Sequence, residues 1–129
     1  MLTCAITGSK GVLGSKLKKK IPLKFYEFHG DITNKKKVNQ WIQKKDFDIL
    51  IHLAALVPTN LVNKNYKKAY EVNVIGTNNL INSLIKKENK PKWLFFSSTS
   101  HVYKPLDKFK KISENSKLDA ASKYGKTKI

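Results

Sequence analysis

The N-terminal region contains the sequence Thr7-Gly8-Ser9-Lys10-Gly11-Val12-Leu13-Gly14, which lies between an apolar segment, residues 2–6, and a Lys-rich segment with helical character, residues 12–20. A strand, a glycine-rich turn and a helix form the arrangement that holds a dinucleotide pyrophosphate. Glycine lets the backbone approach the phosphates, and the helix N-terminus presents free N–H groups. A tight turn alone would also use Gly8 and Gly11, but three glycines at this spacing favour binding. A P-loop is excluded, because its Gly-Lys-Ser/Thr ending is missing.

Apolar strands and helical segments alternate along the rest of the chain. We expect strands over residues 2–6, 23–28, 49–53 and 93–97. We expect helices over residues 12–20, from a cap at Asp31 or Thr33 to about residue 45, over 66–87, and from about residue 122. Residues 54–65 are expected to form a loop and residues 101–118 an irregular polar segment. This alternation predicts a single α/β domain over residues 1–129, a Rossmann-type parallel sheet flanked by helices.

The composition is strongly basic. All 26 basic residues are Lys, against nine acidic residues, and the formal net charge is +17. Nucleic-acid readers usually include Arg, whose planar fork pairs with phosphate and guanine, and this chain has none. The lysines are also dispersed along the chain. We therefore interpret the charge as a solvated surface with no specific nucleic-acid partner, and expect only weak attraction to polyanions at low salt.

The location of the protein is predicted from its apolar segments and its cysteine. The longest apolar stretch, residues 49–57, contains His52 and is too short to span a bilayer. Cys4 is the only cysteine, so an intramolecular disulfide is impossible, which suits a reducing cytoplasm. We expect a cytoplasmic protein with no membrane partner, and we assign no metal site.

Hydroxyl and amine side chains near the C-terminus suggest acid–base chemistry. Tyr124 and Lys128 are four residues apart in a helix-like segment, so both would project from one face. A nearby ammonium would lower the pKa of a tyrosine and make it usable as an acid or base. A Tyr four residues before a Lys also arises easily by chance among 26 Lys. Thr99 follows an apolar strand, at the sheet edge where open α/β folds bind ligands.

Five motifs occur in chain order: Thr7–Gly14; Gly30-Asp31-Ile32; His52-Leu53-Ala54-Ala55; Val72-Asn73-Val74-Ile75-Gly76-Thr77; and Phe96-Ser97-Ser98-Thr99 through Val102-Tyr103, followed by Tyr124-Gly125-Lys126-Thr127-Lys128. Together they resemble the extended short-chain dehydrogenase/reductase family, which comprises nucleotide-sugar epimerases, dehydratases and reductases. The match spans the whole chain. The resemblance implies an NAD or NADP cofactor.

The resemblance assigns cofactor contacts residue by residue. The pyrophosphate would be lined by Gly8, Gly11, Val12, Leu13 and Gly14. The adenine would be flanked by Asp31 and Ile32, and the strand that admits the cofactor would end in Leu53, Ala54 and Ala55. Asn73 would lie on the helix beneath the cofactor. His52 is expected to orient the following loop rather than to catalyse.

The resemblance also assigns catalytic roles. Thr99 would hydrogen-bond the sugar oxygen that is oxidised or reduced, Tyr124 would be the general acid/base, and Lys128 would hold the nicotinamide ribose and tune Tyr124. Ser100 and His101 stand where family dehydratases carry an Asp-Glu pair. This departure favours a 4-epimerase or a 4-keto-sugar reductase over a 4,6-dehydratase.

The segment between Gly14 and Asp31 is short and is similar to the dTDP-4-dehydrorhamnose reductase branch of the family. Glu27, nineteen residues after Gly8, is the one acidic candidate before Asp31 for binding the adenosine ribose. Glu27 alone does not decide between NAD and NADP as the cofactor.

The family pattern continues beyond Lys128 with further strands and a substrate-binding region. We therefore expect residues 93–97 to form an edge strand. We also expect a fragment that binds a dinucleotide weakly and turns over little or nothing. A longer form would act on a nucleotide sugar as a homodimer. The alternative functions are a non-catalytic dinucleotide-binding or redox-sensing module and, on charge alone, a nonspecific nucleic-acid binder.

Overall fold

A computed structural model describes residues 1–107 and 110–129 of the protein. Its sheet has four parallel strands in the order β2-β1-β3-β4. The strands are β1 (Thr3–Thr7), β2 (Lys24–Glu27), β3 (Ile49–His52) and β4 (Trp93–Phe96). Because the strands are parallel, their carboxyl ends meet at one edge of the sheet. The predicted Rossmann-type parallel sheet is confirmed, with strand ends shifted by about one residue.

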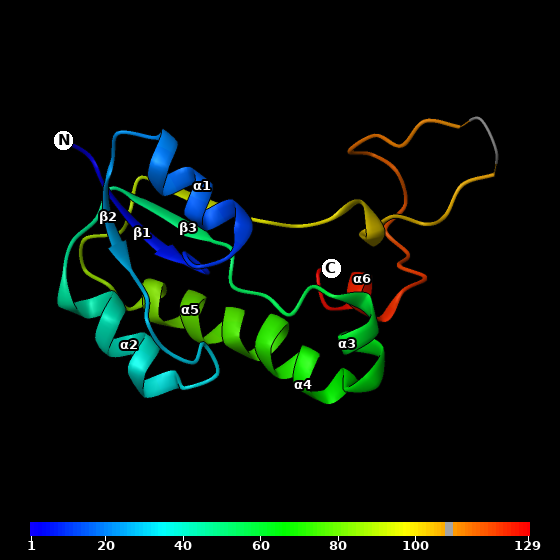
Figure 1. The fold of residues 1–129 in the computed structure, drawn as a ribbon, viewed down its shortest axis with the longest axis horizontal. Coiled ribbons are helices and arrows are strands. Elements are labelled where there is room, and N and C mark those ends of the chain that lie inside the picture. Colours follow the sequence, from blue (N-terminus) through cyan, green and yellow to red (C-terminus); the bar gives the residue numbers. More distant parts are fainter. Residues whose placement is uncertain (108–109) are drawn as a thin grey trace.

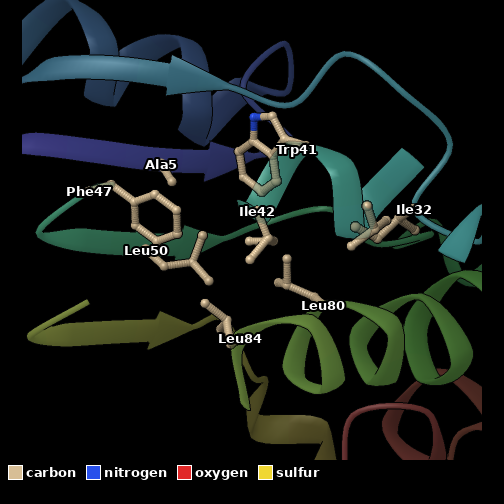
Figure 2. Packing of buried hydrophobic residues seen from close by; sticks show 9 residues of the cluster. Ala5, Ile32, Trp41, Ile42, Phe47, Leu50, Leu80 and Leu84 are labelled. Carbon is tan, nitrogen blue, oxygen red and sulfur yellow. The ribbon is translucent and has the colours of Figure 1, made fainter. Parts of the chain in front are cut away.

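Helices cover both faces of the sheet (Figure 1). The helices of the described residues are α1 (Val12–Lys20), α2 (Lys35–Lys44), α3 (Thr59–Lys64), α4 (Tyr66–Tyr70), α5 (Gly76–Ile85) and α6 (Lys123–Lys126), of which α1, α2 and α5 pack on the sheet. One face packs Cys4, Ile6 and Ile51 against Leu17 of α1. The other face packs against α2 and α5, where Figure 2 shows Leu50 from the sheet, Ile42 from α2 and Leu80 from α5 closing the core.

The structure differs from the sequence prediction in the helices near the carboxyl edge. Residues 54–65 were expected to form a loop but contain α3, which starts directly after Pro58 and buries Val62 completely. Proline is well tolerated at a helix start, so Pro58 introduces the helix instead of preventing it. The predicted helix over 66–87 ends at Ile85 and is divided by a π-helical segment, Glu71–Ile75. A wider turn of this kind is often found at functional sites.

The cap of α2 also differs from the prediction. The N-cap of α2 is Asn34, whose side chain accepts a hydrogen bond of 3.0 Å from the Lys37 amide. Asp31 instead closes the preceding turn, where its carboxylate accepts from the amide and the hydroxyl of Thr33 at 2.9 and 2.8 Å. The last helix, α6, is short and is capped by Ser122, so its predicted start is confirmed.

The segment between β4 and α6 is irregular, as predicted, apart from a 3-10 turn over Ser100–Val102 and an antiparallel bridge between Tyr103 and Leu118. Residues 108 and 109 of this predicted segment lie outside the described residues. β4 is the last strand in the sheet order, so the predicted edge strand is confirmed for the described chain. Its four side chains are between 38% and 54% exposed.

Candidate functional site

The glycine turn between β1 and α1 is closely packed against the end of β3. Gly8 has φ of +72°, and a Cβ added there would lie 2.7 Å from the Ala54 amide nitrogen. A Cβ on Gly14 would lie 2.5 Å from the Gly8 carbonyl oxygen. Larger side chains would therefore push the turn away from β3 and α1. Gly11 is the N-cap of α1 and makes no side-chain cap bond, so the first turn of α1 retains donors for an anion.

A cavity of about 310 Å³ lies in front of this turn. It is lined by Gly8, Ser9, Lys10, Phe28, His29, Gly30 and Ala54. These residues come from the glycine turn, the segment after β2 and the end of β3. A larger hollow of about 410 Å³ lies between α2 and α5. That hollow is lined by lysines and small polar side chains and lacks the glycine turn, so we place the candidate cofactor site at the smaller cavity.

The other predicted cofactor residues occupy different surroundings. Val12 and Leu13 are 79% and 48% exposed at the start of α1, and Leu53, Ala54 and Ala55 are half-buried after β3. Asp31 is exposed, and its hydrogen bonds with Thr33 hold the pKa of its carboxyl below the usual range. Ile32 differs, because it is 4% exposed and packs in the core against α2 and α5. Little of its side chain is open to a ligand.

His52 joins β1 to α5 through hydrogen bonds of both ring nitrogens. Nδ1 lies 2.6 Å from the Thr7 hydroxyl, and Nε2 lies 2.9 Å from the Thr77 hydroxyl. The Thr77 hydroxyl donates to the Asn73 carbonyl at 2.6 Å, so it accepts from Nε2–H. Nδ1 is then the acceptor, and Thr7 donates to it while accepting from the Ala54 amide at 3.2 Å. These bonds assign a neutral imidazole protonated at Nε2.

The surroundings of His52 favour this neutral form. Burial, with a contribution from the Lys128 charge, lowers the pKa of His52 to about 4. His52 thus holds the Thr7 hydroxyl that accepts from the Ala54 amide, and through Thr7 it acts on the loop after β3, in agreement with the orienting role predicted for it. Sequence reasoning missed Thr7 and Thr77 as its partners, although both stand in the quoted motifs.

Asn73 extends these contacts to the C-terminal segment. Its side chain accepts from the Leu56 amide at 2.7 Å and donates to the Leu56 carbonyl at 3.1 Å and the Thr127 hydroxyl at 2.8 Å. Thr127 donates in turn to the Tyr124 carbonyl at 2.7 Å. Asn73 is 2% exposed, so the structure shows it holding the loop after β3 against the Tyr124 segment.

The three predicted catalytic residues lie near the carboxyl edge of β4. Thr99 follows β4 and caps the 3-10 turn, where its hydroxyl accepts from the His101 amide at 3.3 Å. The His101 ring lies edge-on to the Tyr124 ring, with 6.1 Å between centroids. The structure therefore brings the Thr99 segment next to Tyr124.

Tyr124 and Lys128 do not form the predicted pair on one helix face. α6 ends at Lys126, and Lys128 extends instead to the ends of β3 and β4, where its Nζ lies 4.6 Å from the centre of the Phe96 ring. Burial lowers the pKa of Lys128. Burial also raises the pKa of Tyr124, so the predicted lowering by Lys128 is wrong for this structure. Tyr124 is 8% exposed and packs with Val62 and Ala69. Because the best general acids and bases have a pKa near the operating pH, this burial makes Tyr124 a weaker acid in the chain without cofactor.

A sequence model of the family described as GDP-mannose 4,6 dehydratase matches residues 6–129. The chain belongs to this family. Membership in the GDP-mannose 4,6-dehydratase family confirms the resemblance to nucleotide-sugar epimerases, dehydratases and reductases.

Relatives of the chain include several enzymes. It is 30% identical over 125 residues to a bifunctional UDP-glucose 4-epimerase and UDP-xylose 4-epimerase from Pisum sativum, covering 97% of this chain and 34% of the relative. A structure of dTDP-4-dehydrorhamnose reductase from Bacillus anthracis in complex with NADP is 28% identical, with a TM-score of 0.85, covering 98% of this chain and 46% of that one.

A UDP-glucose 4-epimerase from Thermus thermophilus in complex with NAD shares the fold, with a TM-score of 0.88 at 19% identity, covering 98% of this chain and 47% of that one. The chain thus spans about a third of the length of the curated relative and just under half of these solved structures.

Two properties of the described residues bear on other functions. No helix over residues 1–107 or 110–129 is both long and apolar enough to cross a membrane. In the same ranges, no three His, Cys, Asp or Glu side chains gather where they could hold a metal ion.

Proposed function

We propose that this chain binds NAD or NADP at the glycine turn and supplies the cofactor half of a nucleotide-sugar 4-epimerase or 4-keto-sugar reductase. The observation that carries the proposal is the packing of Gly8 and Gly14. Each leaves no room for a Cβ, and together they bring bare backbone and the start of α1 to one cavity. A dinucleotide pyrophosphate needs such an approach to backbone N–H groups. The family membership and the NAD and NADP complexes of similar folds support the same assignment.

The side chains at the carboxyl edge support a role in proton transfer to a sugar oxygen. When bound, the nicotinamide supplies hydride acceptance and donation. In this proposal Tyr124 exchanges a proton with the sugar oxygen and Thr99 hydrogen-bonds that oxygen. Lys128 binds the nicotinamide ribose with an ammonium that has no carboxylate partner among the described residues.

The residues after Thr99 favour epimerase or reductase chemistry over elimination of water. Ser100 and His101 form the first two residues of the 3-10 turn, and neither is a carboxylic acid. A dehydration needs an acid and a base beside the sugar, which the Asp-Glu pair of family dehydratases would supply. The Pisum sativum relative is named as a 4-epimerase and the Bacillus anthracis relative as a dTDP-4-dehydrorhamnose reductase, and both names agree with this choice.

The remaining parts of the proposal concern a longer form of the protein, with the length of its relatives. Relatives extend well beyond the length of this chain, and their additional residues have no counterpart in residues 1–129. We therefore propose that the chain alone binds cofactor with little or no turnover. A longer form would act on a nucleotide sugar as a cytoplasmic homodimer.

A fluorescence titration of the folded chain with NADH and NADPH tests the proposal. We expect saturable binding of at least one of the two. Gly14→Val should abolish it, because the new side chain would collide with the Gly8 carbonyl oxygen. Lys16→Ala, which alters an exposed residue of the same helix, is the control and should bind normally. Absence of binding at millimolar cofactor by a sample with a native circular dichroism spectrum would overturn the proposal.

A further inference from the structure

The cavity in front of the glycine turn has a basic lining. Lys10 comes from the turn itself, and His29 comes from the segment after β2. The remaining lining residues are glycines, Ser9, Phe28 and Ala54, so none of the lining side chains is a carboxylate. A cavity with this lining favours an anionic group over a neutral hydroxyl.

The carboxylate of Glu27 would be expected to offset this positive charge, but it pairs with Lys18 instead. In Rossmann sites that bind NAD, an acidic residue about 20 positions after the glycine turn accepts hydrogen bonds from the adenosine ribose. Glu27 ends β2 at this position, and its Oε2 is paired with Lys18 Nζ of α1 at 2.9 Å. Hydrogen bonds from Lys18 and Ser9 hold the pKa of the Glu27 carboxyl below its usual range. Glu27 is not among the residues that line the cavity.

We infer that the chain prefers NADP(H) to NAD(H), with Lys10 and His29 as the ligands of the 2′-phosphate. The inference rests on the proposed function, because it places the adenosine ribose between the glycine turn and the segment after β2. A 2′-phosphate adds about 1.5 to 2 negative charges at neutral pH. The Lys18–Glu27 ion pair has no net charge, so Lys10 makes the surroundings of that phosphate positive. An unpaired Glu27 would repel the phosphate.

The competing arrangement is NAD binding by Glu27. It requires Glu27 to leave Lys18 and to turn toward the ribose hydroxyls. The two arrangements predict opposite effects of Glu27→Gln. If Glu27 serves only Lys18, the substitution leaves NADH affinity unchanged and leaves NADPH affinity unchanged or stronger. If Glu27 binds the ribose, NADH affinity falls.

The test is direct binding to the intact 129-residue chain. NADPH and NADH are titrated by fluorescence at one pH and one salt concentration, and 2′,5′-ADP and 5′-ADP are compared as competitors that lack nicotinamide. We expect NADPH to bind about tenfold more tightly than NADH, the effect of one charge-assisted contact of about 1.4 kcal/mol. 2′,5′-ADP should compete better than 5′-ADP.

Variants assign the preference to individual side chains. Lys10→Ala and His29→Ala should each bring the ratio of affinities toward one by weakening NADPH alone. Lys16→Ala removes the same charge as Lys10→Ala from an exposed position on α1 and should keep the ratio.

Equal or tighter binding of NADH would overturn the inference, as would a ratio that survives both Lys10→Ala and His29→Ala. In either case the proposed function would stand, because a cofactor is bound. Failure of the folded chain to bind either dinucleotide would instead overturn the proposed function, and the inference with it.

Discussion

His52 should make the free energy of unfolding decrease as the pH is lowered from 6.5 toward 4. Burial and the Lys128 charge lower the pKa of His52 from 6.5 to about 4 in the folded chain. Between these pH values the unfolded chain binds a proton at His52 that the folded chain does not bind, so acid favours unfolding. Above pH 6.5 the imidazole is neutral in both states, and its contribution to stability is fully present.

The size of the decrease in unfolding free energy follows from the lowered pKa of His52. One pKa unit corresponds to about 1.4 kcal/mol, so a pKa lowered from 6.5 to about 4 gives a loss of about 3 kcal/mol across the whole range. About 2 kcal/mol of this is lost above pH 5. Asp31, Asp46 and Glu27 also have lowered pKa values, but their stabilisation is lost only as the pH falls below their ordinary values of 3.8 to 4.5. The interval from pH 6.5 to 5 therefore isolates His52 from these carboxylates.

Urea unfolding followed by circular dichroism at several pH values between 5 and 7.5 measures this decrease. The same series on His52→Gln should lack the His52 contribution to the slope. Because that variant removes buried hydrogen bonds, titration of the His52 ring by NMR in the wild-type chain provides an independent measurement and should give a pKa below 5. A free energy of unfolding that stays constant from pH 6.5 to 5, or a His52 ring that titrates near 6.5, would refute the reasoning.

Three further substitutions test other parts of the structure by urea unfolding. Lys128→Met should leave the free energy of unfolding unchanged or raise it by about 1 kcal/mol, because it removes a buried ammonium without a carboxylate partner in the described residues. A decrease of more than about 2 kcal/mol would show instead that the charge stabilises the fold. Asn73→Ala should cost about 2–3 kcal/mol, since it breaks the bonds to the Leu56 loop and to the C-terminal segment, while Asn78→Ala at an exposed position nearby should cost little. Trp41→Ala should lower the free energy of unfolding by about 3–5 kcal/mol, because Trp41 is 8% exposed and stacks on the rings of Tyr26 and Phe47. A decrease of less than about 1 kcal/mol would contradict its place in the core.

Local sequence patterns were sufficient to predict the sheet and the glycine turn. Continuous apolar runs such as residues 49–51 mark buried parallel strands. Gly8 and Gly14 stand where the backbone approaches too closely for any other residue. α3 was missed because Val62 is its one buried residue, which leaves no apolar periodicity to detect. The π-helical turn at Glu71–Ile75 has no distinctive composition at all.

Contacts between distant residues could not be predicted, because they depend on strand register and helix placement. The pairing of Glu27 with Lys18 and the bonds of His52 to Thr7 and Thr77 are of this kind. The sequence suggested Glu27 as a ribose ligand, but it contained no sign that Lys18 would occupy the carboxylate. The Tyr124–Lys128 pairing failed for a similar reason, since it assumed that the helix continues past Lys126.

The central claim is that the glycine turn binds a dinucleotide, and an amide NMR titration of the labelled chain with NADPH tests it residue by residue. We predict saturable shifts of the Gly8, Gly11 and Gly14 amides and of Ala54, which faces the same cavity. The amides around the larger hollow between α2 and α5 should stay unchanged. Shifts confined to that hollow, or no shifts at millimolar NADPH in a folded sample, would contradict the claim.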